Sequence, residues 1–320
     1  MTVLVTGATG FIGNHVAQAL LRHGQSVRCL VRPELPLHPR AALPDGAEQV
    51  AGDLLDGPSL HRATDGCEAV FHVAAMYELW APDPGAFYRV NVDGTRLVLE
   101  SARAAGASVV FTSSVSTIPP GGDERDFSQP STIHSHYKRS KILAERLVLA
   151  HPGAIVVNPS TPIGRGDARP TPTGKIVLDF LRGRMPAFVD TGLNLVDVED
   201  VAEGHILAWR RGRPGQRYIL GNANLTLQAM LNILARQSGR PAPRVRLPLA
   251  AAYATGALSE IFEGRLLGRT PAVPFEAVRM AATPMYYDAS KARTELGLPQ
   301  TPVSTALRKA AQWFLTNGYC

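Results

Sequence analysis

Residues 3–13, VLVTGATGFIG, join a short aliphatic run to the start of a helix-like pattern. Three of these residues, Gly7, Gly10 and Gly13, fall within one turn. Glycine has no Cβ and tolerates positive φ, so its backbone can approach another group closely. Where such a turn opens a helix, free N–H groups and the helix dipole favour a phosphate. The stretch therefore predicts a dinucleotide-binding turn that follows the first strand of a sheet.

Short apolar runs alternate with helix-period stretches through the first half of the chain. This alternation predicts an α/β fold of the Rossmann type, a doubly wound parallel sheet with helices on both faces. The expected strands are Val3–Thr6, Ser26–Val31, Glu48–Ala51, Ala69–Val73, Ser108–Thr112 and Ala154–Asn158. The expected helices between them are Phe11–His23, Pro58–Thr64, Ala86–Ala105 and His134–His151.

The pattern changes after about Pro159, where PSTPIGRGDARPTPTG is expected to form a loop. We predict an NADP-binding domain over residues 1–165 and a smaller, mostly helical substrate-binding part over residues 166–320. One later strand, Arg217–Leu220, is expected to return to the first sheet. The expected helices of the second part are Lys175–Gly183, Asp200–Arg210, Leu227–Ser238, Ala250–Leu267 and Ser304–Thr316.

Composition excludes several classes of protein. The 33 basic and 27 acidic side chains leave a net charge of +6 that is spread along the chain, so we expect a solvated surface and no nucleic-acid partner. No apolar run reaches the roughly 20 residues that span a bilayer, and the first residues lack a basic segment typical of a signal peptide. The three cysteines are scattered without metal-ligand spacing, which fits a cytoplasmic protein without a metal site.

The end of the second expected strand, VRCLVRP, indicates which dinucleotide binds. An NAD-binding site usually carries an acidic residue there, on the ribose 2′-hydroxyl, but this chain has Val31 followed by Arg32. An arginine pairs with a 2′-phosphate, so we predict NADP(H) rather than NAD. The alternative is that Arg32 simply ends a strand in solvent. Asp53, after the third strand, is expected to accept from the adenine amino group or else to cap the next helix.

The stretch HSHYKRSKILAE contains Tyr137 and Lys141, which lie one turn apart on one face of an expected helix. The carboxyl ends of parallel strands form the active crevice, so FTSSVST at the end of the fifth strand places Ser113 and Ser114 beside Tyr137. We prefer Ser114 as the substrate-positioning serine. The alternative is a surface tyrosine with a solvated lysine.

These residue types suit hydride-transfer chemistry. A free tyrosine has a pKa near 10, and the Lys141 ammonium, helped by an oxidised nicotinamide ring, is expected to lower the pKa of Tyr137. The phenol can then exchange a proton with a substrate oxygen while hydride moves to or from nicotinamide.

In this order and spacing, TGATGFIG, GDL, HVAA, NVDGT, FTSS, Tyr137-x-x-x-Lys141 and NPSTPIG resemble an extended short-chain dehydrogenase/reductase of the NAD-dependent epimerase/dehydratase family. The resemblance covers essentially the whole chain. More narrowly, HYKRSK, NPSTPIG, the stretch from Arg169 to His205 and RYILG resemble the bacterial hopanoid-associated sugar epimerases, a group similar to dihydroflavonol 4-reductases. That group's name reflects an association with hopanoid synthesis and establishes no reaction.

The resemblance implies that Tyr137 is the general acid/base, that Lys141 is its electrostatic partner and a ribose ligand, and that Ser114 positions the substrate. It implies a brace for the catalytic region at Asn91, which could instead be a helix cap, and it implies a homodimer. The expected cofactor-binding residues are Gly7, Thr9, Gly10, Phe11, Ile12, Gly13, Arg32, Asp53, Leu54, Ala74, Ala75, Asn91, Thr112, Tyr137, Lys141, Pro159, Ser160 and Thr161.

One departure concerns the substrate. Nucleotide-sugar epimerases typically carry an RDYIHV-like run whose arginine grips a diphosphate, whereas this chain has LNLVDVED, with Leu193 in the arginine's place. Arg165 and Arg169 could replace that arginine or could solvate a loop. In MYELWAPDP, Tyr77 and Trp80 suit stacking on a sugar or apolar ring, or else core packing. The expected substrate contacts are Tyr77, Trp80, Ser114 and Arg165.

The sequence is compatible with three hypotheses about function. The first is an NADP(H)-dependent reductase or dehydrogenase acting at a carbonyl or hydroxyl carbon of a small sugar-like or hopanoid-linked substrate. The second is a nucleotide-sugar epimerase or dehydratase that retains its cofactor. The third is a non-catalytic NADP-binding sensor, which the intact set of Ser114, Tyr137 and Lys141 disfavours.

Overall fold

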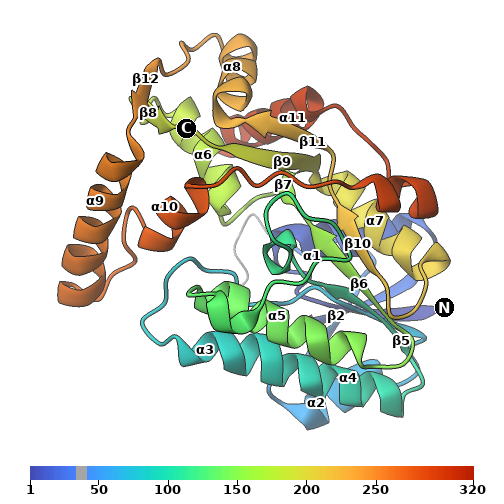
Figure 1. Ribbon diagram of the computed structural model, residues 1–320. Helices are drawn as coiled ribbons and strands as arrows, with labels where there is room; N and C mark the ends of the chain where they lie inside the picture. Colours follow the sequence, from blue (N-terminus) through green and yellow to red (C-terminus); the bar gives the residue numbers. More distant parts are fainter. Residues whose placement is uncertain (34–41) are drawn as a thin grey trace.

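The computed structural model describes residues 1–33 and 42–320 (Figure 1). Its main element is a seven-stranded sheet with the order β10-β6-β5-β4-β1-β2-β3, in which every strand pair is parallel. The order runs outward from β1 in both directions, which creates a crevice at the carboxyl ends of β1 and β4. The strands are β1 (Thr2–Thr6), β2 (Ser26–Val31), β3 (Glu48–Ala51), β4 (Ala69–His72), β5 (Ser108–Thr112), β6 (Ala154–Pro159) and β10 (Arg217–Leu220). The predicted Rossmann-type fold class is confirmed.

The strands are apolar on both sides because helices cover both faces of the sheet. Val3 and Val5 point into one core and Leu4 into the other, and all three are fully buried. The helices over the first face are α1 (Phe11–Arg22) and α7 (Val198–Arg211), and those over the second are α2 (Gly57–Thr64), α4 (Gly94–Ala104) and α5 (His136–Leu149).

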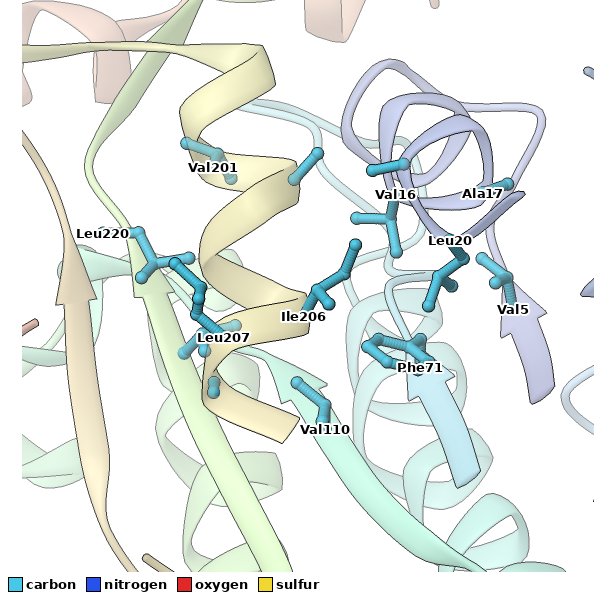
Figure 2. Close-up of a cluster of buried hydrophobic side chains, with 14 of the residues drawn as sticks. Val5, Val16, Ala17, Leu20, Phe71, Val110, Val201, Ile206, Leu207 and Leu220 are labelled. Carbon is cyan, nitrogen blue, oxygen red and sulfur yellow. The ribbon is translucent and has the colours of Figure 1, made fainter. Parts of the chain in front are cut away.

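Figure 2 shows the first of these cores, where α1 and α7 lie side by side. Leu20 of α1 and Ile206 of α7 meet above Phe71 of β4 and Val110 of β5, and all four side chains are buried. The helix α7 comes from the C-terminal half of the chain. Residues after 166 therefore complete the nucleotide-binding half of the molecule by adding α7 and β10.

The remaining C-terminal elements form a second core. Its helices are α6 (Pro172–Leu181), α8 (Leu227–Ser238) and α11 (Val303–Thr316). One small sheet contains β7 (Thr161–Ile163), β9 (Gly192–Asp197) and β11 (Ala223–Thr226). A second pairs β8 (Ala187–Val189) with β12 (Val245–Leu247). The sequence pattern predicts none of these five strands, and it predicts loop where β7 forms. These strands read TPI, AFV, GLNLVD, ANLT and VRL: they are three residues long or are interrupted by polar residues, so no aliphatic run marks them in the sequence.

Two predicted helices are interrupted. The helix expected at 86–105 consists of α3 (Gly85–Tyr88), a π-helical turn η1 (Arg89–Asp93) and α4, and the helix expected at 250–267 consists of α9 (Leu249–Ser259) followed by a π-helical segment η4 (Glu260–Leu266). The short elements outside the predictions are η2 (Val115–Thr117), η3 (Pro130–Thr132), α10 (Phe275–Ala281) and η5 (Ala292–Leu296). Within the described ranges, no helix combines the length and the apolar character needed to cross a membrane.

Candidate active site

The three glycines of the turn after β1 differ in how much space a side chain would have. A Cβ on Gly7 would lie 2.7 Å from the Ala74 nitrogen, and a Cβ on Gly13 would lie 2.1 Å from the Gly7 oxygen, so both residues allow chain segments to touch. Gly7 also has a positive φ of 78°. Gly10 is exposed, and a Cβ there would meet only the Gly7 oxygen, at 3.3 Å. Gly10 begins α1, and no side chain caps this end of the helix. Its first N–H groups therefore face outward and fit a pyrophosphate.

The residues expected around the adenosine end lie next to this turn. Arg32 is exposed and directly follows β2, whose register pairs Leu30 with Thr6. The Asp53 carboxylate accepts from the Leu55 N–H at 2.8 Å, in the turn before α2. Leu54 is buried and packs against Gly94 of α4. The structure thus places Arg32 and Asp53 at the cofactor edge of the sheet, with Leu54 beneath them in the core.

The side chain of Asn91 links the loop after β4 to helix α5. It sits in the π-helical turn η1, a distortion that is common at functional sites. Its amide donates to the Met76 oxygen at 3.1 Å and to the Ser140 hydroxyl at 2.9 Å, and it accepts from the Met76 N–H at 2.7 Å. Ser140 in turn donates to the Tyr137 oxygen at 2.8 Å. The side chain of Asn91 therefore braces α5 through a neighbouring serine, and does not cap a helix.

The tyrosine and serine that the sequence singles out come together at the carboxyl ends of β4 and β5. Tyr137 lies in the first turn of α5 and is 8% exposed. The hydroxyl groups of Ser114 and Ser116 interact with its phenol. The Tyr77 ring packs edge-on against the Tyr137 ring, with 5.1 Å between the centroids, and Tyr77 is itself exposed. An exposed aromatic ring thus forms one wall of the site.

Lys141 lies one turn after Tyr137 and is almost completely buried. Its ammonium donates to the Thr112 oxygen at 2.7 Å and lies 4.4 Å from the centroid of the Phe111 ring. Burial lowers the pKa of Lys141 to about 7, and the Glu145 carboxylate opposes this shift. The Thr112 hydroxyl pairs with a ring nitrogen of His205 at 2.8 Å, which joins β5 to α7 behind the lysine.

The expected lowering of the Tyr137 pKa is wrong for this structure. Burial raises the pKa of Tyr137 to about 12, although its interactions with Ser114 and Ser116 lower it in part. The Lys141 ammonium is directed at the Thr112 oxygen and does not contribute to the shift. The phenol is therefore protonated at neutral pH, which suits a proton donor.

The sequence analysis missed a buried carboxylate. Glu145 lies one turn after Lys141 and is 2% exposed, and its Oε1 lies 2.9 Å from Nε of Arg217, which is 3% exposed. The spacing of four residues from Lys141 was a signal for Glu145, because it repeats the Tyr137–Lys141 interval on the same helix face. No local signal points to Arg217, since β10 is remote in sequence.

The same carboxylate holds the loop that carries Ser114. Its Oε2 accepts from the Thr117 hydroxyl at 2.9 Å and from the Asn158 amide at 2.8 Å. Thr117 and Asn158 also donate to the Ser114 backbone oxygen, at 2.8 and 3.1 Å. Glu145 thus links the helix of Tyr137 and Lys141 to the backbone of Ser114.

Among the described residues, two buried hydroxyl groups at the strand ends have no protein partner. These are the Oγ atoms of Ser113, after β5, and Ser160, after β6. Buried polar groups are normally satisfied, so unpaired ones at the carboxyl ends of β5 and β6 fit a polar ligand such as a nicotinamide carboxamide. The other expected cofactor residues nearby are Thr9, Phe11, Ile12 and Ala75, which are half-buried, and Pro159 and Thr161, which are buried.

Several residues expected to contact substrate or diphosphate have other partners. Trp80 lies against Gly264 of η4, where a Cβ would come within 3.2 Å of the indole nitrogen. Arg165 pairs with Glu199 of α7 at 2.8 Å. Leu193 is 9% exposed and packs in the second core, so no cation replaces it at that point.

Comparison with known proteins identifies the family. Residues 3–221 match the model of the NAD dependent epimerase/dehydratase family. The chain belongs to this family. It is therefore an NAD(P)-dependent enzyme of the oxidoreductase type with the extended short-chain dehydrogenase/reductase fold.

Two curated relatives cover nearly the whole chain. A putative dihydroflavonol 4-reductase of Synechocystis sp. is 47% identical over 98% of this chain and 95% of its own length. Sterol demethylase protein B of Methylococcus capsulatus is 34% identical over 99% of each chain. Among solved structures, a nucleoside-diphosphate-sugar epimerase of Pseudomonas aeruginosa superposes with a TM-score of 0.81, at 26% identity over 100% of this chain and 99% of that one.

Proposed function

We propose that the protein is an NADP(H)-dependent reductase that acts on the carbonyl group of a ring-bearing substrate. The observation that carries this proposal is the meeting of Ser114, Tyr137 and Lys141 in the crevice beside the glycine turn. Crevices at the switch point of a doubly wound sheet hold the dinucleotide, so these side chains lie where its reactive end is expected.

Each side chain has one task in the proposed reaction. When bound, the nicotinamide supplies a hydride to the carbonyl carbon. Tyr137 donates its phenolic proton to the carbonyl oxygen, and its raised pKa keeps that proton available at neutral pH. Ser114 donates a hydrogen bond to the same oxygen. Lys141, whose ammonium is directed at the Thr112 oxygen, would act as a ligand of the cofactor ribose.

Arg32 supports NADP(H) over NAD(H). Its guanidinium is exposed beside the glycine turn. The preceding position, where a ribose-binding carboxylate is expected, holds Val31 and not an acidic residue. A guanidinium pairs with a 2′-phosphate and a carboxylate repels it. The homodimer and the cytoplasmic location remain predictions.

An apolar, ring-bearing carbonyl compound fits the site better than a nucleotide sugar. Tyr77 offers an exposed aromatic wall at Tyr137, and the buried Leu193 provides no donor for a diphosphate. The relatives named for dihydroflavonol reduction and sterol demethylation are consistent with such a substrate, and a hopanoid-linked or sugar-like carbonyl compound remains within this class.

The second candidate is a nucleotide-sugar epimerase that retains its cofactor. The likeness to a nucleoside-diphosphate-sugar epimerase over the full chain favours it. This enzyme would consume no NADPH, because the hydride returns to the same substrate. Purified protein would then carry dinucleotide that resists removal.

The test is NADPH oxidation against a panel of ring ketones, with the Tyr137→Phe variant beside the wild type. We expect the variant to bind NADPH normally and to lose turnover by about a hundredfold or more. Tyr253→Phe, on α9, is the matched control and should keep full activity. Turnover that survives in Tyr137→Phe would reject the mechanism, and tightly retained dinucleotide without NADPH oxidation would favour the epimerase.

A further inference from the structure

Large hydrophobic side chains are exposed together on α9 and η4. Isolated exposed leucines are ordinary on protein surfaces, but a contiguous apolar patch marks an interaction site. Among the described residues, five of the twelve exposed large hydrophobic side chains fall within residues 258–267. These five, here called the apolar face, are 47–68% exposed and comprise Leu258, Ile261, Phe262, Leu266 and Leu267.

The apolar face is the outer side of a helical segment whose inner side is also apolar. The inner side packs on α10: Ala252 and Gly256 are buried, and a Cβ on Gly256 would come within 3.0 Å of Val278. Figure 1 shows α9 at the outer edge of the molecule, with α10 between it and the main body. The exposed residues fall at position 258, at 261 and 262, and at 266 and 267, so the three groups are three to five residues apart, as one side of a helical segment requires.

The charges around this segment are arranged asymmetrically. Its acidic side chains are half-buried and used internally: Glu263 accepts from the Ala272 N–H, and Glu276 pairs with Lys138. By contrast, Arg269 and, on α10, Arg279 are exposed. The free surface beside the apolar face is therefore cationic.

The segment also borders the active site. Trp80, three residues after Tyr77, contacts η4 at Gly264. Lys138, the residue after Tyr137, has its Nζ 3.7 Å from the Glu276 carboxylate of α10. The apolar face and the site of Tyr137 therefore lie on neighbouring parts of one surface.

We propose that the apolar face docks on the surface of an anionic lipid bilayer. Exposed Leu, Ile and Phe side chains beside arginines suit the boundary between headgroups and acyl chains, where the arginines attract anionic lipid. A second copy of the chain fits less well, because a two-fold interface would bring the same arginines against each other. If the proposed function also holds, a carbonyl compound dissolved in the bilayer would reach Tyr137 from this side.

The test is co-sedimentation of the full-length protein with vesicles, without cofactor or substrate. We expect about tenfold tighter binding to vesicles of phosphatidylcholine with phosphatidylglycerol than to phosphatidylcholine alone, and weaker binding at high salt. Phe262→Glu and Leu266→Glu should abolish binding without lowering the melting temperature, because both side chains are exposed. Leu315→Glu, on α11 and 51% exposed, is the matched control and should bind as the wild type does.

Three results would overturn the proposal. The wild type could stay in the supernatant with both kinds of vesicle, or the two variants could bind as the wild type does. Sedimentation velocity could also show that the variants dissociate a dimer while vesicle binding is unchanged, which would make the apolar face a self-interface. None of these results bears on the reductase proposal, and Tyr137→Phe should bind vesicles normally.

Discussion

Glu145 and Arg217 form an ion pair of 2.9 Å that joins the catalytic helix α5 to the edge strand β10. Both side chains are almost fully buried. Two charges taken out of water need compensation, which the Thr117 and Asn158 side chains supply at Glu145. The same two side chains donate to the backbone oxygen of Ser114, so the ion pair is linked to the loop that carries Ser114.

Breaking this ion pair on one side should destabilise the fold. Glu145→Leu leaves the buried Arg217 guanidinium without its ion-pair partner, and we expect the free energy of unfolding to fall by about 3–5 kcal/mol. The double variant Glu145→Leu, Arg217→Met should recover most of that loss, since an apolar pair of similar volume avoids both desolvation penalties. Urea denaturation of the two variants measures this.

Stability and turnover should separate in the double variant. Its fold returns, but Thr117 and Asn158 lose the carboxylate that fixes them beneath Ser114, so we expect kcat to stay about tenfold low with NADPH affinity unchanged. If turnover recovers together with stability, Glu145 has only a structural role.

The glycine turn should respond differently at its last two glycines. Gly13→Ala places a Cβ 2.1 Å from the Gly7 oxygen, so the variant should lose about 3 kcal/mol or more of folding free energy. Gly10→Ala meets only one atom at 3.3 Å and should fold normally, yet bind NADPH about tenfold more weakly because the methyl group faces the phosphate. Thermal unfolding and fluorescence titration separate the two effects. Normal NADPH binding by Gly10→Ala would show that the phosphate lies elsewhere.

The sequence predicts the main sheet well because its strands are buried on both faces and appear as runs of Val, Ile and Leu. It predicts Tyr137 and Lys141 because their spacing is local to one helix. The short strands β7, β8, β9, β11 and β12 depend on pairings between distant segments, and so does the contact of Glu145 with Arg217. The prediction that the pKa of Tyr137 is lowered was wrong for a related reason. The pKa is raised by burial, and burial depends on the tertiary structure around the side chain.

Arg32 should decide the choice of dinucleotide. Arg32→Ser removes the proposed partner of the 2′-phosphate, so we expect NADPH affinity to fall about tenfold or more while NADH affinity stays constant. Fluorescence titration of the apo-protein measures both affinities, and Arg62→Ser, exposed on α2, serves as the charge-matched control. Equal affinity of the wild type for NADH and NADPH would reject the assignment to Arg32.

Two buried histidines should make the fold sensitive to acid. Burial lowers the pKa of His72 to about 3 and that of His205 to about 4, whereas an unfolded histidine titrates near 6.5. Below about pH 6.5 the unfolded chain therefore binds protons that the folded chain does not, and the free energy of unfolding falls as pH falls toward the folded pKa values. Between about pH 7 and about pH 5.5 the two groups together should remove about 2.5 kcal/mol.

Removing one of these histidines tests whether they cause the loss of stability at low pH. His205→Gln eliminates one titrating group, so the decrease in the free energy of unfolding over the same pH interval should shrink by about 1.3 kcal/mol. His61→Gln, on the exposed surface of α2, should leave the decrease unchanged. Urea denaturation at both pH values gives the comparison, and an unaltered decrease in His205→Gln would assign the acid sensitivity to other groups. Because His205 holds the Thr112 hydroxyl and Thr112 accepts from Lys141, protonation of this histidine should also disturb the lysine in the active site.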